Sequence, residues 1–131
     1  MAKKKRSLPF DKRGGALVLQ RRMLESSAYS FLTPEAKVLL LLLQTHWRND
    51  KPVAYGVREA MDKIPCAKGT AQRAFEQVQR SGFAELVDES QFSTRTHSRA
   101  RTWRLTWLPF MDKPPSNEWE KLGSPGQKCT L

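Results

Sequence analysis

Cysteine is scarce in this chain, and its positions form no recognisable pattern. Cys66 and Cys129 are the only two among 131 residues, and they match neither a disulfide framework nor the spacing of metal ligands. A reduced cytoplasmic protein is therefore the simplest interpretation. We expect no metal and no cofactor.

Long apolar runs are also missing. The longest, Val38–Leu43, is far below the ~20 residues needed to cross a bilayer. The basic start of the chain is not followed by the apolar stretch of a signal peptide. We expect no contact with a membrane.

Catalytic patterns are equally sparse. The two histidines, His46 and His97, stand apart, and there is no pair of carboxylates or glycine-rich phosphate loop. Glu59 and Asp62 fit the surface of a helix, and Cys66 fits a small residue in a turn better than a reactive thiol. We predict that the chain is not an enzyme.

Basic residues, by contrast, are plentiful. The formal net charge is +10, from 23 Lys and Arg against 13 Asp and Glu, which favours a polyanionic partner. Residues 1–22 hold eight basic side chains and one acid. Residues 1–15, ending in Gly14-Gly15, are predicted to be a flexible basic arm; a solubility tail is the alternative. The candidate DNA contacts in the arm are Lys3, Lys4, Lys5, Arg6, Lys12 and Arg13.

The first half of the chain contains one clear helix signal. Thr33 suits an N-cap and Pro34 the first helical position, and the helix is predicted to run to about Trp47. Its segment Val38–Leu43 is apolar on every side, so this is either the central core helix or a helix that meets another subunit. Shorter elements are expected at 17–19 (a strand), 21–29 (one or two helical turns) and 52–55 (a third strand).

The second half of the chain predicts a helix, a turn, a second helix and a hairpin. Val57–Lys63 has the i, i+3, i+4, i+7 spacing of a half-buried helix, and Lys68–Ser81 follows it after a break and stops at Gly82. Phe83–Val87 and Thr102–Leu108 can pair as strands.

This order of elements predicts an α+β winged helix-turn-helix, with three to four helices and a hairpin of two to three strands. The expected division is a flexible basic arm at 1–15, the winged helix-turn-helix domain at 16–109, and an irregular C-terminal tail at 110–131.

A recognition helix at 67–81 has the side chains that reading a major groove requires. Its outer face holds polar and basic donors, among which Gln suits adenine and Arg suits guanine. Glycine near its start would let a phosphate approach the helix N–H groups. The alternative is an ordinary solvated face. The candidates are Lys68, Gly69, Thr70, Gln72, Arg73 and Gln77.

The wing, predicted at 90–102, lies in a stretch that has no acid between Gln91 and Met111. Spaced basic side chains there suit the backbone or the minor groove of DNA. A disordered loop with accidental charge is the alternative. The candidates are Arg95, His97, Arg99 and Arg101.

Several short motifs resemble one family. They are Leu32–Lys37, Gly56–Ala60, Gly69–Phe75, Ser81–Phe83, Thr102–Thr106 and Lys113–Trp119. Together they resemble the small winged helix-turn-helix DNA-binding proteins of bacterial mobile elements, phages and plasmids, over roughly residues 14–120. The turn residues Pro65, Cys66 and Ala67 depart from the Gly and Ser or Thr usual there.

The resemblance implies a bacterial DNA-binding module, and we expect sequence-specific binding of double-stranded DNA by a transcription regulator, such as a repressor, associated with the nucleoid when bound. One alternative is an initiator or accessory protein of plasmid or phage replication. The other is a basic module that binds RNA or an acidic protein. A homodimer would double the length of the site, with Val38–Leu43 or the segment around Trp119 as the interface.

Overall fold

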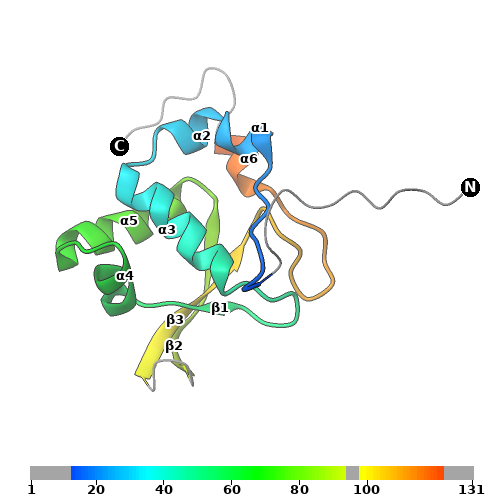
Figure 1. Ribbon diagram of the computed structural model, residues 1–131. Helices are drawn as coiled ribbons and strands as arrows, with labels where there is room; N and C mark the ends of the chain where they lie inside the picture. The colour runs from blue at the N-terminus through cyan, green and yellow to red at the C-terminus, as the bar shows by residue number, and fades with distance from the viewer. Residues whose placement is uncertain (1–12, 94–97, 123–131) are drawn as a thin grey trace, which may run out of the picture.

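A computed structural model describes residues 13–93 and 98–122, and for 89–93, 98–100 and 122 only the backbone. Three strands form one antiparallel sheet in the order β1-β3-β2, α5 packs against β2, and α3 packs against α5 (Figure 1). The predicted α+β class is confirmed, and the order of elements is compatible with a winged helix-turn-helix. The described elements are α1 (Arg21–Leu24), α2 (Ser27–Ser30), α3 (Pro34–Thr45), β1 (Val53–Ala54), α4 (Val57–Lys63), α5 (Lys68–Arg80), β2 (Ala84–Ser93), β3 (Ser98–Leu105) and α6 (Glu118–Leu122).

Helix α3 is the central helix of the core. Thr33 caps it as predicted, with its side-chain oxygen accepting a hydrogen bond from the Ala36 N–H at 3.3 Å. Leu39, Leu40 and Leu43 are buried. Val38 is 40% exposed, so the apolar run is explained mainly by packing within this chain. The helix ends at Thr45, two residues before the predicted end at Trp47.

Helices α4 and α5 follow the predicted boundaries closely. The Cys66 N–H donates to the Met61 carbonyl at 3.2 Å and closes the turn between them. On α5 the predicted apolar stripe is buried, and Gly82 follows the helix with φ 83°. A left-handed residue just after a helix is the usual place for glycine. The stripe comprises Ala71, Ala74, Phe75 and Val78.

The hairpin of β2 and β3 is longer than predicted and irregular. Its strands extend into the segment predicted as a loop, and Trp107, predicted within the second strand, is buried beyond the end of β3. Register shifts occur between Leu86 and Asp88 and between Asp88 and Gln91, with the extra residues on β2. Such bulges bend and twist a strand, which explains why this segment lacks a simple apolar alternation.

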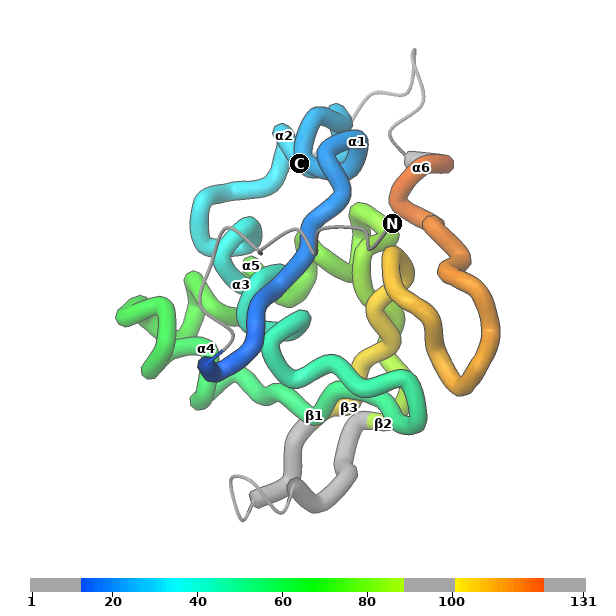
Figure 2. The backbone as a smooth tube through the Cα atoms, turned by 45° about the vertical axis from the view of Figure 1, so that its right-hand side comes forward, coloured from blue at the N-terminus to red at the C-terminus, as the bar shows by residue number. Residues whose placement is uncertain are grey.

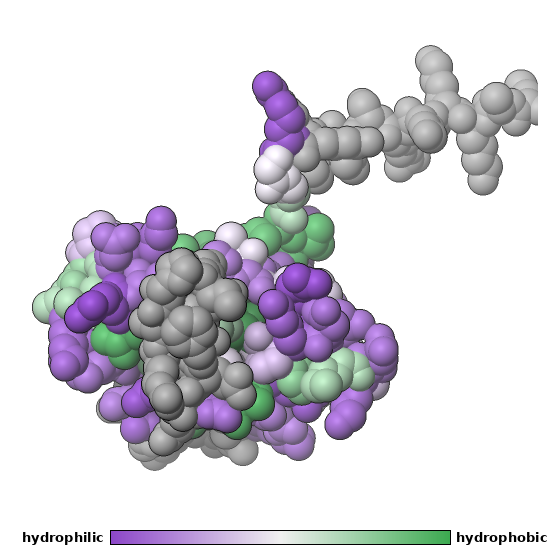
Figure 3. All heavy atoms as spheres, turned by 90° about the horizontal axis from the view of Figure 1, so that it is seen from below, coloured by the Kyte–Doolittle hydropathy of each residue, from purple (hydrophilic) through white to green (hydrophobic). Residues whose placement is uncertain are grey.

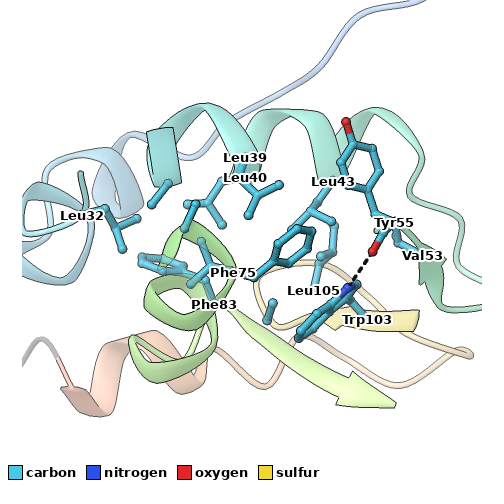
Figure 4. Packing of buried hydrophobic residues seen from close by; sticks show 14 of the residues in the cluster. Leu32, Leu39, Leu40, Leu43, Val53, Tyr55, Phe75, Phe83, Trp103 and Leu105 are labelled. Carbon is cyan, nitrogen blue, oxygen red and sulfur yellow. Dashed lines mark hydrogen bonds between the residues drawn. The ribbon is translucent and has the colours of Figure 1, made fainter. Parts of the chain in front are cut away.

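Aromatic side chains join the sheet to the helices. Trp103 on β3 stacks on Phe75 of α5 with ring centroids 5.4 Å apart, and its Nε1–H donates to the Tyr55 carbonyl at 3.2 Å (Figure 4). Both rings are buried. Trp103 on β3 is therefore joined both to α5 and to Tyr55, the residue that follows β1.

Residues 110–117 are irregular apart from an isolated bridge between Phe110 and Lys113, but the irregular tail predicted from residue 110 also contains a short helix, α6. The Asn117 N–H donates to the Thr106 carbonyl at 2.9 Å, and α6 follows at once. Trp119 is 3% exposed and stacks on Phe83 at 5.8 Å. The folded unit thus continues past 109, and Trp119 belongs to its own core instead of offering a subunit interface.

Replacing Gly82 by alanine should weaken the docking of α6. A Cβ at this position would lie 2.9 Å from the Glu118 carbonyl carbon, and φ is already +83°. Left-handed strain alone costs about 1–3 kcal/mol, and the backbone overlap adds to it. Urea denaturation should show the loss. Gly14→Ala is the matched control, because φ is +76° there and nothing lies within 4 Å. An equal effect of both changes would contradict the close approach of α6.

The strand predicted at 17–19 is also absent from the described fold. This segment is extended and runs past α3 (Figure 2), and the Gln44 Nε2–H donates to the Val18 carbonyl at 2.9 Å. Gln44 Oε1 in turn accepts from Trp107 Nε1–H at 3.0 Å. The Gln44 amide thus takes the place of the backbone hydrogen bonds that a neighbouring strand would make. The spacing of apolar residues cannot predict such a contact.

Candidate nucleic-acid interface

The start of α5 brings together five of the six residues predicted for the recognition helix. Lys68, Gln72 and Arg73 are exposed, and Gly69 and Thr70 are half-buried. They occupy the first two turns. Gly69, Gln72 and Arg73 lie on the side opposite the buried stripe, whereas Lys68 and Thr70 lie beside it, three and four residues before Ala71 and Ala74. This end of the helix therefore offers hydrogen-bond donors of several lengths to a partner.

The first turn of α5 carries positive electrostatic potential. Its N-cap is Ala67, whose side chain cannot cap, and there is no acid in the turn. The N–H groups at a helix start lack partners within the helix and carry partial positive charge. Lys68 adds a full charge at the same place. An anion is thus the favoured neighbour of this turn.

Arg73 folds back over the start of the helix. Its Nη2–H donates to Thr70 Oγ1 at 3.2 Å, and its Nη1 lies 3.3 Å from the point that a Cβ on Gly69 would occupy. The nearest contacts of this guanidinium therefore come from α5 itself. The missing side chain of Gly69 accommodates Arg73, whereas the sequence suggested that it would admit a phosphate.

Gln77 does not belong with this group. Its Oε1 accepts a hydrogen bond from the Thr33 N–H at 2.9 Å, so the side chain supports the start of α3. The physical reason is helical spacing: Gln77 lies three residues after Ala74 and next to Val78, on the edge of the buried stripe. Gln77 was predicted to contact DNA, and this prediction is corrected because its side chain contacts the start of α3 instead.

Two basic side chains are described on the hairpin, Arg104 and Arg101, and the one predicted for the wing is Arg101. It is exposed, and it lies two residues before Trp103 on β3, so both side chains project from the same face of the sheet. Arg101 is thus on the side of the sheet that α5 covers. The backbone of Arg99 pairs with Phe92. Arg95 and His97 lie outside the described residues.

The basic arm is described only at its end. Arg13 is exposed. The other arm candidates, Lys3, Lys4, Lys5, Arg6 and Lys12, lie outside the described residues.

Two exposed basic residues of α4 were not among the candidates predicted from the sequence. Arg58 and Lys63 are exposed, next in the fold to α5. The signal was present, because both fall outside the apolar set that buries α4.

Other basic side chains are engaged within the fold. Arg104 lies over the Phe110 ring at 5.4 Å, and Arg22 lies over Trp119 and pairs with Glu120. Figure 3 looks at the end of the molecule from which the hairpin projects, and most of the coloured side chains there are hydrophilic.

The two residue types most often found in catalytic and metal sites, histidine and cysteine, lie in structural surroundings where the structure describes them. His46 Nε2 lies 3.8 Å from Glu59 Oε2 beside the Tyr55 ring, and Cys66 is half-buried against the core. Within residues 13–93 and 98–122, no group of three or more His, Cys, Asp or Glu could hold a metal ion. No helix in the described part of the chain is long and apolar enough to cross a membrane.

Comparisons with known proteins return nothing for this chain. No protein-family model, no curated protein and no solved structure matches it.

Proposed function

We propose that the protein binds double-stranded DNA as a winged helix-turn-helix, with the first turns of α5 in the major groove. The observation that carries the proposal is the exposed group of Lys68, Gln72 and Arg73 at an acid-free helix start. A helix whose first turn presents unpaired N–H groups and basic side chains can bind both phosphates and base edges.

The hairpin supports this arrangement. In Figure 1 it extends away from the end of the molecule where α1, α2 and α6 gather. Arg101 projects from the face of the sheet that packs on α5. A helix in the major groove would thus have Arg101 beside it for the flanking backbone or minor groove.

The biological role that we infer is regulation of transcription in a bacterium or a bacterial mobile element, in the cytoplasm. A homodimer is part of the proposal, because a single helix of 13 residues contacts few base pairs. Two half-sites about one DNA turn apart are then expected. Repeated sites near a replication origin, instead of a site beside a promoter, would assign the protein to replication.

Competition binding tests the partner class. A labelled duplex is bound at several salt concentrations and then challenged with unlabelled duplex, single-stranded DNA and RNA. Duplex should compete best, and affinity should fall steeply with salt because released counterions drive the binding. Better competition by RNA would contradict the proposal and favour an RNA-binding module.

Substitutions at Ala67, the N-cap of α5, distinguish an effect on the stability of the fold from an effect on phosphate binding. Ala67→Ser and Ala67→Asp should each stabilise the fold by about 0.5–2 kcal/mol, because both side chains can accept from the uncapped N–H groups of α5. Thermal unfolding measures this. DNA affinity should be kept in Ala67→Ser and reduced in Ala67→Asp, whose charge repels a phosphate. Equal affinity of the two variants would show that no phosphate approaches this turn.

A further inference from the structure

The guanidinium of Arg73 contacts the first turn of its own helix. Thr70 Oγ1 accepts from Nη2 at 3.2 Å, and Nη1 lies over Gly69. Arg73 forms no ion pair among the described residues, and its helix has no acid in the first turn. An exposed arginine normally samples many conformations and loses that freedom on binding. The contact with Thr70 reduces this loss.

Gly69 has no backbone reason to be glycine. It lies inside α5, where φ is negative and glycine is among the least favourable residues. A methyl group at this position would meet Arg73 Nη1 at 3.3 Å, tighter than ordinary contact. The absence of a side chain at residue 69 therefore leaves room for the guanidinium where it now lies.

We infer that Thr70 and Gly69 are positioning residues that hold the Arg73 guanidinium to read a guanine in the major groove. This rests on the proposed function. A fixed planar fork matches the O6 and N7 acceptors of guanine, which demand two parallel hydrogen bonds. A phosphate can also take a bidentate arginine, but it accepts a lysine as a point charge as well, so it depends less on a fixed guanidinium.

The probe is a duplex in which single guanines of the preferred site are replaced by 7-deazaguanine, which lacks the N7 acceptor. Wild-type protein should lose about 5- to 150-fold in affinity at one guanine, as expected for a bidentate pair. Arg73→Ala should bind both duplexes equally. This comparison identifies the base that Arg73 reads.

The positioning role is then tested at residues 69 and 70. Thr70→Val, which keeps the shape and removes the acceptor, should reduce the preference for guanine over 7-deazaguanine by about 2- to 10-fold. Thr70→Ser should retain the preference. Gly69→Ala should raise the melting temperature, because alanine is the better helix former, and should still reduce the preference for guanine over 7-deazaguanine. If Gly69 had only a structural role, a more stable variant would keep that preference.

Two results would overturn the inference, and they differ. If Thr70→Val and Gly69→Ala keep the wild-type preference for guanine, the positioning role is wrong, while DNA reading by α5 stands. If wild-type protein prefers no duplex sequence at all, the proposed function fails and this inference with it.

Discussion

Replacing Trp103 by alanine is expected to destabilise the protein by about 3–5 kcal/mol. The side chain is 1% exposed, stacks on Phe75 and donates to the Tyr55 carbonyl. Its loss leaves a cavity between α5 and the sheet and a buried carbonyl without its donor. Since small domains are stable by only 5–15 kcal/mol, much of the folded population could be lost. Urea denaturation followed by circular dichroism measures the change.

Two controls accompany the Trp103 variant. Trp103→Phe keeps an aromatic ring against Phe75 and loses the N–H, so it should cost less than the alanine variant. Val18→Ala should cost little, because Val18 is 77% exposed. A Trp103→Ala variant as stable as Val18→Ala would contradict the core described above.

The double variant Lys68→Ala/Arg73→Ala is expected to show the largest loss of DNA binding. Arg73→Ala alone should cost about 1–3 kcal/mol and relax the sequence preference. Loss of a phosphate contact at Lys68 should weaken binding to all sequences. It should also reduce the slope of log affinity against log salt concentration by about one. Both side chains are exposed, so the melting temperature should stay near that of the wild type.

Lys51→Ala/Lys113→Ala is the matched control for this double variant. It removes the same charge from two exposed positions. These lie in turns that Asn49 and Asp112 join by a 2.8 Å hydrogen bond, on the side away from α5 (Figure 1). Fluorescence anisotropy with a labelled duplex compares the two. Equal losses would mean that only net charge matters, against a specific role of α5.

The sequence predicted those parts of the fold that local rules determine. Apolar spacing placed α4 and α5, a threonine and a proline placed the start of α3, and Gly82 marked the end of α5. The polar face of α5 followed from the same periodicity. Gln77 was misplaced because it lies at the edge of the buried stripe, where a partner on α3 decides its role.

The remaining errors concern contacts between distant segments. The length of the hairpin depends on two bulges in β2, which no periodicity indicates. Docking of α6 depends on the close approach of Gly82 to Glu118, two residues far apart in the chain. One missed contact is local: the hydrogen bond of Arg73 to Thr70 spans one helical turn and could have been predicted from its i, i+3 spacing.

Selection of binding sites from a pool of random duplexes, followed by footprinting of the selected site, distinguishes sequence-specific reading by α5 from a general attraction to DNA. We expect an enriched motif that contains guanine and is protected from cleavage. The enrichment should be lost when Lys68 and Arg73 are replaced by alanine but kept in Lys51→Ala/Lys113→Ala. Failure to enrich any motif, with all duplexes bound equally, would contradict sequence-specific reading of DNA by α5.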